Sequence, residues 1–405
     1  MKRAAVVGAG ISGILSAYYL KKAGFEVTIF EKQPGVAMQC SRANGGQISV
    51  CNSATWNTWG NVGKGLKWML SPSAPFLIKP SPSLQKLTWI AGFMRHTINS
   101  THRSNTIETV KLGLQSRELY KQIAHDEMLF YNQSVCGLLN LYTDNATMIA
   151  AVKNAEVLSD AGLEIFPVAP EQILKIDPTL SNFKGLIGGL HTPSDFIGDC
   201  HLFCKMLGIK LQQEGVKFAR MDVEEIERKH GFVFIYGSTG SEKVLTGGYD
   251  AVVLANGHEM RKMASKFGDF LNIYPVKGYS ISIDLPEDAL HAAPKLSLLD
   301  DERKIVCSLL GLTLRVAGTA ELDGENLDIK MNRIQPLLSW VASNFPKLDI
   351  ASYFPWACLR PMSSDMMPIV KQSSVKGVWY HGGHGHLGWT LGAATAKQLA
   401  EKIIS

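Results

Sequence analysis

Three glycines near the N-terminus constrain the fold more than any other feature of this sequence. Gly8, Gly10 and Gly13 follow directly on the apolar run Ala-Ala-Val-Val at 4–7, in the spacing Gly-x-Gly-x-x-Gly. The first glycine permits a tight turn, the second lets the backbone approach a pyrophosphate, and the third lets a helix pack closely on a strand. A helical pattern continues to Leu20. The segment therefore predicts a strand–turn–helix unit that binds a dinucleotide.

A second strand completes this unit. The run Phe-Glu-Val-Thr-Ile-Phe at 25–30 ends at Glu31, and Lys32 follows. An acidic side chain at the tip of the second strand accepts hydrogen bonds from a ribose diol. The pyrophosphate would lie at the positive end of the helix, beside Ile11 and Ser12. This motif alone does not distinguish FAD from NAD.

Three further segments favour FAD. They are residues 39–49 just beyond the second strand, the apolar strand and Ala-Asn-Gly end at 249–257, and a glycine-rich loop that runs into an amphipathic helix at 381–403. Reduced flavin carries negative charge around its pyrimidine ring, and backbone amides at a helix N-terminus stabilise such charge. The candidate cofactor contacts in these segments are Asn44, Gly45, Gly46, Gln47, Asn256, Gly257, Gly383, His384, Gly385, Leu387, Gly388, Trp389 and Thr390.

Composition excludes several other classes of protein. The chain of 405 residues is 46% apolar and carries a formal net charge of +5, as expected of an ordinary globular protein. We expect no nucleic-acid partner, because its basic residues form no long run. The seven cysteines form no Cys-x-x-Cys pair, so we expect no metal site. Reduced thiols in the cytoplasm are the simplest interpretation.

Several motifs, in order along the whole chain, resemble the FAD-dependent oxidoreductases of the D-amino-acid oxidase and glycine oxidase type. They are SRANGGQIS at 41–49, GDCHLFCKML at 198–207, PVKGYS at 275–280, LRVAGTAEL at 314–322, LRPMSSDMMPIV at 359–370 and GHGHLGWTLGAATAKQLAE at 383–401. Within this family the chain is most similar to the bacterial D-amino-acid dehydrogenases of the small-subunit type.

The resemblance implies an α/β fold with a discontinuous layout. A Rossmann-like FAD-binding domain would use residues 1–95, 147–274 and 350–405, and an α+β substrate domain built on an antiparallel sheet would use 96–146 and 275–349. The sequence agrees with this layout. Residues 280–284 and 312–320 have the pattern of antiparallel strands, and residues 330–345 that of a helix.

The resemblance also implies oxidative deamination of a D-amino acid. Hydride would pass from the α-carbon to the flavin N5, and the imino acid would hydrolyse to a 2-oxo acid. Arg360, in the LRPM motif, is the candidate for binding the substrate carboxylate, because a guanidinium pairs with it bidentately. Tyr279 is a weaker candidate for donating to the same group. We assign no general base, leave the role of His384 open, and interpret His386 as incidental.

The electron acceptor is open on sequence alone. The resemblance favours a respiratory quinone or another electron-transfer partner, whereas an oxidase of glycine, sarcosine or another secondary amine would use oxygen. A flavin-binding redox partner without turnover is a third hypothesis, which the retention of Arg360 disfavours. A covalent flavin link through Cys40 is a further, weaker hypothesis.

Residues 55–94 are informative about the localisation of the protein in the cell. Four tryptophans alternate there with prolines and with Lys64, Lys67, Lys79 and Lys86. Aromatic rings beside lysines suit a membrane interface, although the tryptophans could equally pack into the protein's own core. The resemblance favours a cytoplasmic protein with peripheral contact to the inner face of the cytoplasmic membrane.

Overall fold

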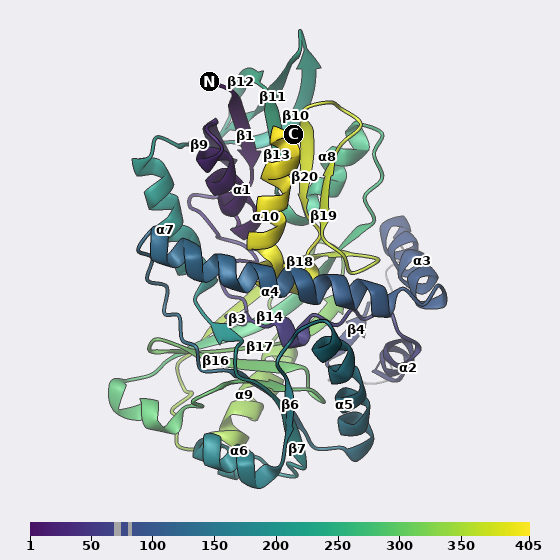
Figure 1. Ribbon diagram of the computed structural model, residues 1–405, viewed down its shortest axis with the longest axis vertical. Helices are drawn as coiled ribbons and strands as arrows, with labels where there is room; N and C mark the ends of the chain where they lie inside the picture. The colour runs from purple at the N-terminus through teal and green to yellow at the C-terminus, as the bar shows by residue number, and fades with distance from the viewer. Residues whose placement is uncertain (69–73, 80–82) are drawn as a thin grey trace.

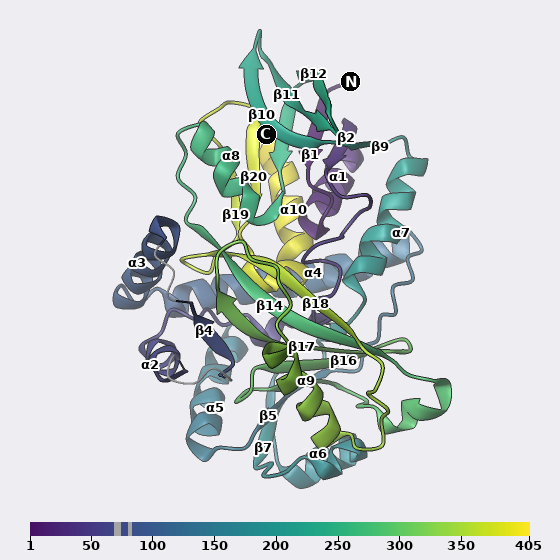
Figure 2. The same cartoon turned by 180° about the vertical axis from the view of Figure 1, so that it is seen from behind.

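Two large β-sheets lie one beyond the other along the length of the molecule (Figures 1 and 2). The computed structural model describes residues 1–68, 74–79 and 83–405. One sheet is mainly parallel and Rossmann-like, and the other is mostly antiparallel. The predicted α/β class, with a dinucleotide-binding sheet and an antiparallel second sheet, is confirmed.

The first sheet is six-stranded within the described residues. Its strands, in spatial order, are β19 (Ile369–Gln372), β20 (Val378–Gly382), β13 (Ala251–Leu254), β1 (Arg3–Val7), β2 (Glu26–Glu31) and β9 (Lys217–Arg220). All neighbours pair in parallel except β19 and β20. The apolar runs that predict β1, β2 and β13 are buried on both faces, as parallel strands usually are.

Helices cover one face of this sheet and a smaller sheet covers the other. Ala4 and Val6 of β1 pack against α1 (Ile11–Lys22), α7 (Cys200–Gln213) and α10 (Gly388–Ile404). The alternate residues Ala5 and Val7 pack against α8 (Met260–Lys266) and the antiparallel strands β10 (Asp222–Lys229), β11 (Phe232–Thr239) and β12 (Glu242–Tyr249). The period-two alternation of a strand thus divides β1 between two cores.

The second sheet is nine-stranded within the described residues. Along its main path lie β18 (Phe354–Ser363), β14 (Ile273–Asp284), β17 (Thr313–Leu322), β16 (Ile305–Leu310), β15 (Ser297–Asp300), β5 (Leu138–Tyr142), β7 (Gly188–Thr192) and β6 (Phe166–Val168), with β4 (Phe76–Ile78) paired to β17. The antiparallel strands predicted at 280–284 and 312–320 belong to β14 and β17, which pair with each other. The predicted helix at 330–345 is α9 (Met331–Asn344), and its apolar side packs on this sheet.

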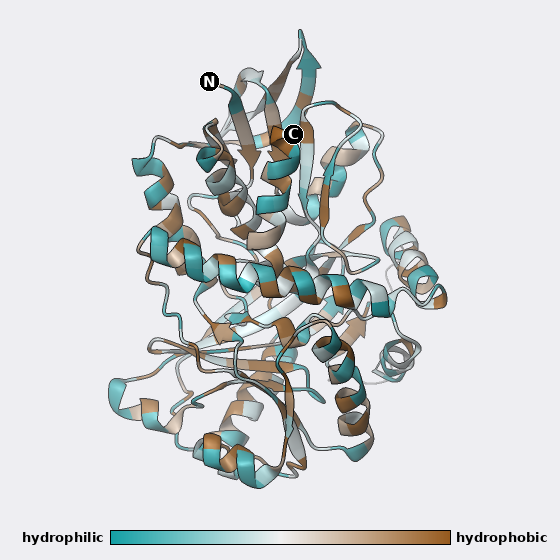
Figure 3. Cartoon of the chain, viewed as in Figure 1, coloured by the Kyte–Doolittle hydropathy of each residue, from teal (hydrophilic) through white to brown (hydrophobic). Residues whose placement is uncertain are grey.

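Long helices join and border the two sheets. Helix α4 (His102–Asp126) crosses the middle of the molecule and packs against α10, and its hydrophilic and hydrophobic stretches alternate (Figures 1 and 3). Helices α2 (Trp59–Trp68) and α3 (Leu84–Ile98) lie together at one side of the molecule, whereas α5 (Asn145–Asp160) and α6 (Pro170–Ile176) accompany the second sheet. The strands β3 (Gln47–Ile48) and β8 (Phe196–Ile197) form a short antiparallel pair, and β3 contacts α10.

The domain ranges expected from the sequence stay a prediction. Within the range 147–274, which we assigned to the cofactor domain, β6 and β7 pair with the second sheet. From the range 350–405, β18 joins the same sheet beside β14. Helix α4, from the range 96–146, packs against α10 of the cofactor-binding side. The chain therefore crosses between the two sheets more often than the expected ranges imply.

Candidate active site

A cavity of about 870 Å³ extends from the carboxyl ends of β1, β2 and β13 to the inner face of β14, β17 and β18. Ligands of open α/β sheets bind at the carboxyl ends of parallel strands. The predicted residues that line the cavity are Gly8, Gly10, Ile11, Ser12, Glu31, Lys32, Asn44, Gly45, Gly46, Gln47, Asn256, Gly257, Tyr279, Arg360, His384, Gly385, Gly388 and Trp389. Most of the predicted contacts are therefore brought together, from segments far apart in the sequence.

The three motif glycines meet three different demands. Gly8 has a φ of 98°, and a Cβ there would lie 2.8 Å from the Ala255 carbonyl oxygen. A Cβ at Gly13 would lie 1.8 Å from the Gly8 carbonyl oxygen, so α1 touches the turn at this point. A Cβ at Gly10 would meet only the Ser41 hydroxyl, at 3.6 Å. Gly10 therefore leaves room on the cavity side, whereas Gly8 and Gly13 are required by the fold.

The N-terminus of α1 opens on this cavity without an anionic partner of its own. Its N-cap is Gly10, which offers no side-chain cap, and its first turn contains no acidic residue. The Ser41 hydroxyl accepts a hydrogen bond from the Ile11 amide at 3.1 Å. The positive end of the helix is therefore available to a phosphate group.

Glu31 and Lys32 stand at the tip of β2. The two oxygens of the Glu31 carboxylate accept hydrogen bonds from the Ala9 amide at 2.7 Å and from the Gln33 amide at 2.8 Å. These bonds hold the carboxylate at the cavity wall, and each oxygen keeps a lone pair for a further donor. The Lys32 ammonium pairs with Glu259, which also lines the cavity. Lys32 is thus already engaged by a neighbouring carboxylate.

Asn256 carries an unsatisfied polar atom. Its Oδ1 is buried and has no hydrogen-bond partner among the described residues. Buried polar groups are almost always hydrogen-bonded, so an orphan at the wall of a cavity indicates a missing ligand group. Asn256 and Gly257 follow β13 after Ala255, at the same sheet edge as the glycine turn.

The glycines at 45 and 46 are explained by packing. A Cβ on Gly45 would lie 2.8 Å from Val306 of β16, and one on Gly46, where φ is 72°, would lie 2.8 Å from Leu310. Asn44 Oδ1 accepts a hydrogen bond from the Gly46 amide at 3.0 Å. Residues 44–46 therefore pack closely on β16 of the second sheet, and they also line the cavity.

The histidines of the C-terminal loop divide into two kinds. His384 links α1 to α10, because its Nε2 lies 2.9 Å from Thr395 Oγ1 and its Nδ1 3.5 Å from Ser12 Oγ. Burial lowers the pKa of His384 to about 4. The ring of His386 instead stacks on Trp56, with centroids 4.6 Å apart and planes at 22°. Burial and then the charge of Arg360 lower the pKa of His386 to about 4, so both rings are neutral near pH 7.

Four predicted cofactor contacts do not line the cavity: Gly13, Gly383, Leu387 and Thr390. Thr390 accepts a hydrogen bond from the Ser49 amide at 3.2 Å, and Leu387 is buried in a small apolar cluster. A Cβ at Gly383 would lie 3.0 Å from Ile369, and the φ there is 71°. Thr390, Leu387 and Gly383 therefore support the residues of the cavity wall and do not line the cavity themselves.

Arg360 projects from β18 into the cavity and makes no hydrogen bond or ion pair with the described residues. Its guanidinium lies over Gly278 of the neighbouring strand β14, where a Cβ would come within 2.3 Å of Nη2. A half-buried guanidinium needs an anionic partner. Arg360 is therefore placed to pair with a carboxylate in the cavity.

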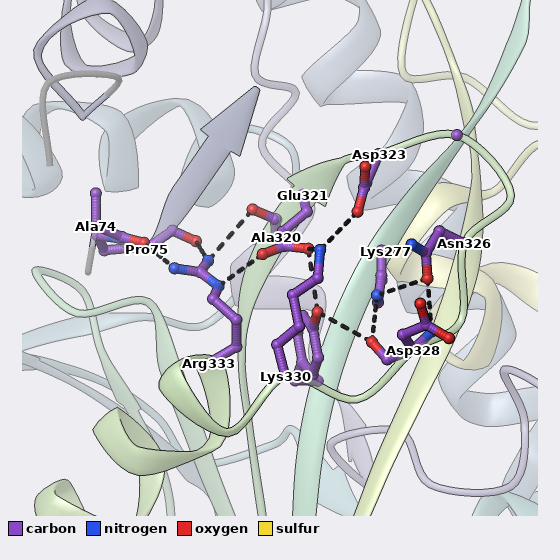
Figure 4. A network of polar contacts seen from close by, with 12 residues as sticks. Ala74, Pro75, Lys277, Ala320, Glu321, Asp323, Asn326, Asp328, Lys330 and Arg333 are labelled. Carbon is purple, nitrogen blue, oxygen red and sulfur yellow. Dashed lines mark hydrogen bonds and ion pairs between the residues drawn. The ribbon is translucent and has the colours of Figure 1, made fainter. Parts of the chain in front are cut away.

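Tyr279 is engaged elsewhere. Its hydroxyl donates a hydrogen bond to Glu321 Oε2 at 3.0 Å, and its ring is 1% exposed within the core beneath α9. Glu321 forms a buried ion pair with Arg333 of α9, between Oε1 and Nε at 3.1 Å. Figure 4 shows this pair within a wider polar network that includes Lys277, Asp323 and Lys330. The structure thus gives no support to donation from the Tyr279 hydroxyl to the substrate carboxylate.

Sequence reasoning missed a group of residues that complete the far wall of the cavity. They come from strands and loops far apart in the sequence: Asn52, Asn140, Tyr142, Asp301 and Lys304, together with Trp56 of the region 55–94 and Thr319 of the LRVAGTAEL motif, to neither of which a site role was given. Among them the Lys304 ammonium pairs with Asp301 at 2.5 Å. Only the folding of the second sheet brings these side chains together.

A model of the family described as FAD dependent oxidoreductase matches residues 3–402. The chain is 43% identical to D-amino acid dehydrogenase 3 of Mesorhizobium japonicum, over 100% of this chain and 97% of that protein. It is 36% identical to the D-amino acid dehydrogenase of Dechloromonas aromatica, over 99% and 96% of the two chains. The chain belongs to the FAD-dependent oxidoreductase family. The glycine oxidase structure from Geobacillus kaustophilus superposes with a TM-score of 0.76 at 18% identity, over 99% of this chain and 95% of that chain, which shows the shared fold.

The observed site fits the cofactor of this family of FAD-dependent oxidoreductases. The space beside Gly10, the uncapped N-terminus of α1 and the orphaned Asn256 oxygen are features that a dinucleotide would use. Glu31 stands where a ribose diol would be bound. Among the described residues, no cluster of His, Cys, Asp and Glu has the composition of a metal site.

Proposed function

We propose that this chain is an FAD-dependent D-amino-acid dehydrogenase. The observation that carries the proposal is the guanidinium of Arg360, which has no partner among the described residues and lies in the same cavity as the dinucleotide-binding turn. Full-length relatives at 31–43% identity bear the name D-amino acid dehydrogenase, which supports this activity. The reaction oxidises the α-carbon of the amino acid, and the resulting imino acid hydrolyses to a 2-oxo acid.

The protein's part in this reaction is to bind and orient. Arg360 holds the carboxylate with two parallel N–H···O bonds and so fixes the direction of the Cα–H bond. The Trp56–His386 stack stands in the same cavity and limits where the rest of the substrate can lie. FAD, which Gly10, Glu31 and Asn256 would hold, would supply the acceptor for the hydride. His384 and His386 are neutral near pH 7 and add no positive charge beside the substrate's amino group.

Anaerobic bleaching of the flavin band near about 450 nm, the usual position for oxidised flavin, tests the substrate assignment. We expect D-amino acids to bleach the FAD-loaded protein, and L-amino acids, glycine and sarcosine to leave it oxidised. Bleaching by glycine or sarcosine with hydrogen peroxide release in air would instead establish the oxidase. A protein that binds FAD but is bleached by none of these compounds would contradict the dehydrogenase.

The electron acceptor is a membrane quinone in this proposal, and α2 and α3 supply the membrane contact. Leu84, Leu87 and Ile98 of α3 are 78%, 61% and 62% exposed, and Trp59 of α2 is 61% exposed. Leucines and isoleucine at this spacing share one side of a helix. Lys64 and Lys67 are exposed on α2, the helix beside α3 in Figure 1, and their charge favours an anionic surface.

The tryptophans of residues 55–94 are not all available for a membrane contact. Trp89 is buried and donates to the Met362 carbonyl at 2.8 Å, and Trp56 and Trp68 line the cavity. Pro72, Pro80 and Pro82 lie outside the described residues. Lys86 is buried, and its ammonium donates to the Lys79 carbonyl at 2.8 Å. Within the described part of the chain, no helix has both the length and the apolar character needed to cross a bilayer.

Co-sedimentation with vesicles tests the membrane contact. We expect binding to vesicles that contain anionic lipid and weaker binding to zwitterionic ones. Leu87→Asp should reduce sedimentation, whereas Ile149→Asp should not, because Ile149 is even more exposed, at 70%, but lies on α5. Equal binding by all three proteins would rule out α3 as the contact, without bearing on the substrate.

A further inference from the structure

Two cysteines from distant parts of the sequence meet at the cavity wall. Cys40 lies in the segment that follows β2, and Cys358 lies in β18. The Cys40 thiol donates its single proton to the Leu359 carbonyl at 2.9 Å, and it lies close enough to the Cys358 thiol to donate to that sulfur instead. Both residues are half-buried and line the same cavity.

Their surroundings give the two thiols different characters. The ability of Cys40 to donate to an ionised Cys358 lowers the pKa of Cys358; burial opposes this shift, and the positive charge of Arg360 supports it. The bond to Cys358 and burial raise the pKa of Cys40. A thiol with a lowered pKa beside one that keeps its proton is the arrangement of an attacking and a resolving cysteine.

A second pair in the same molecule provides a contrast. Cys200 and Cys204 stand one turn apart on α7, and their thiols are also close enough to affect each other's pKa. They are 1% and 0% exposed and do not line the cavity. Burial is the first cause of the raised pKa of Cys204. The cavity pair differs in exposure and in its neighbouring positive charge, and it joins two separate segments.

We propose that Cys40 and Cys358 are a redox-active pair that closes into a reversible disulfide and ties residues 39–49 to β18. The oxidant is a low-molecular-weight disulfide. The Cys358 thiolate attacks one of its sulfurs, which forms a mixed disulfide and releases one thiol. Cys40 then loses its proton and attacks the Cys358 sulfur, which releases the second thiol. The protein pair loses two electrons and two protons, and the small disulfide is reduced to two thiols.

The bond would act on the substrate site through β18. Cys358 and Arg360 are two residues apart on this strand and point to the same face. A disulfide would draw Cys358 toward Cys40 and so shift the part of β18 that carries Arg360. The Arg360 guanidinium already lies directly against Gly278 and has little room to adjust. The disulfide itself does not depend on the proposed function, whereas its effect on the substrate rests on that function.

The test uses the FAD-loaded protein, equilibrated with mixtures of oxidised and reduced glutathione, then alkylated and analysed by peptide mass spectrometry without reduction. We expect a Cys40–Cys358 cross-link that dithiothreitol reverses, and a KM for a D-amino acid raised by about 10-fold in the oxidised form. Cys40→Ser and Cys358→Ser should each abolish the cross-link and the change in KM. Cys200→Ser, the matched control, should keep both.

Two results would overturn the proposal. One is a folded, FAD-loaded protein whose Cys40 and Cys358 stay separately alkylated, or carry only glutathione, across the whole range of mixtures. The other is a cross-link that leaves KM unchanged while D-amino acids still bleach the flavin. Bleaching is recorded on the reduced protein, so a failure of the proposed substrate is seen independently of the disulfide.

Discussion

Arg360 of β18 rests on the bare Cα of Gly278 in β14. A side-chain Cβ at residue 278 would lie 2.3 Å from the Arg360 Nη2 and 2.5 Å from its Cζ. Real Cβ atoms do not approach other heavy atoms so closely, so Gly278 is needed for the guanidinium to lie where it does. The geometry of carboxylate binding thus depends on two strands, and on the absence of a side chain from one of them.

Gly278→Ala should therefore displace the guanidinium without removing its charge. We expect kcat/KM for a D-amino acid to fall by about 100-fold, because a misplacement of about 1 Å in a positioning group has an effect of this size. Steady-state assays with a dye acceptor measure it. Gly63→Ala is the matched control, because a Cβ there meets nothing within 4 Å. An active Gly278→Ala enzyme would show that Arg360 does not hold the carboxylate.

Tyr279→Phe separates the sequence prediction from the structural finding. Because the hydroxyl donates to Glu321, we expect its loss to lower the free energy of unfolding by about 1.5–3 kcal/mol, as for hydrogen bonds to charged groups. KM should change by less than about 2-fold, whereas Arg360→Lys should raise it strongly because the bidentate fork is lost. Urea unfolding and steady-state kinetics on the same preparations give both values. A large rise in KM for Tyr279→Phe would restore its predicted role at the carboxylate.

Gly10 and Gly13 should respond differently to the same substitution. Gly13→Ala places a methyl 1.8 Å from the Gly8 carbonyl oxygen, so we expect loss of folded protein. Gly10→Ala meets only the Ser41 hydroxyl at 3.6 Å, so we expect a folded chain that binds FAD weakly. Circular dichroism reports the fold, and the ratio of flavin to protein absorbance reports cofactor content. Normal FAD content in Gly10→Ala would place the pyrophosphate elsewhere.

The sequence predicted those parts of the site that local motifs encode. The turn at Gly8, the carboxylate of Glu31 and the end of β13 at Asn256 come from short strand–loop segments, and each meets the cavity as expected. The family resemblance supplied Arg360 and the antiparallel second sheet. The role of Tyr279 at the carboxylate stays a prediction, because sequence does not say which partner its hydroxyl finds in the folded chain. The partner of its hydroxyl, Glu321, lies on another strand.

Contacts across the second sheet were beyond sequence reasoning. Lys304 and Asn140 reach the cavity through a sheet in which β15 pairs with both β5 and β16, and no local pattern encodes that order. Residue 45 must be glycine for a similar reason: a Cβ there would collide with Val306, which lies on the distant strand β16. Long-range pairing of this kind depends on the whole fold.

His384 predicts how stability depends on pH. Burial lowers its pKa to about 4 in the folded protein, from an ordinary value of 6.5, so the unfolded chain binds a proton that the folded chain excludes. The neutral ring's contribution is therefore fully present above pH 6.5 and is lost as the pH falls toward 4. From these two values, His384 should lower the free energy of unfolding by about 2 kcal/mol between pH 7.5 and pH 5.

Urea unfolding of the FAD-loaded protein at the two pH values measures this loss. His384→Gln should retain about 2 kcal/mol more of its stability on acidification than the parent chain does, because glutamine takes up no proton. The shifts at His386 and His381 have the same direction and remain in this variant, so the pH dependence should shrink and not vanish. His125→Gln is the control, since the His125 side chain is 89% exposed. An unchanged pH dependence in His384→Gln would mean that the imidazole between Ser12 and Thr395 is protonated in the folded protein, which would place a positive charge next to the N-terminus of α1.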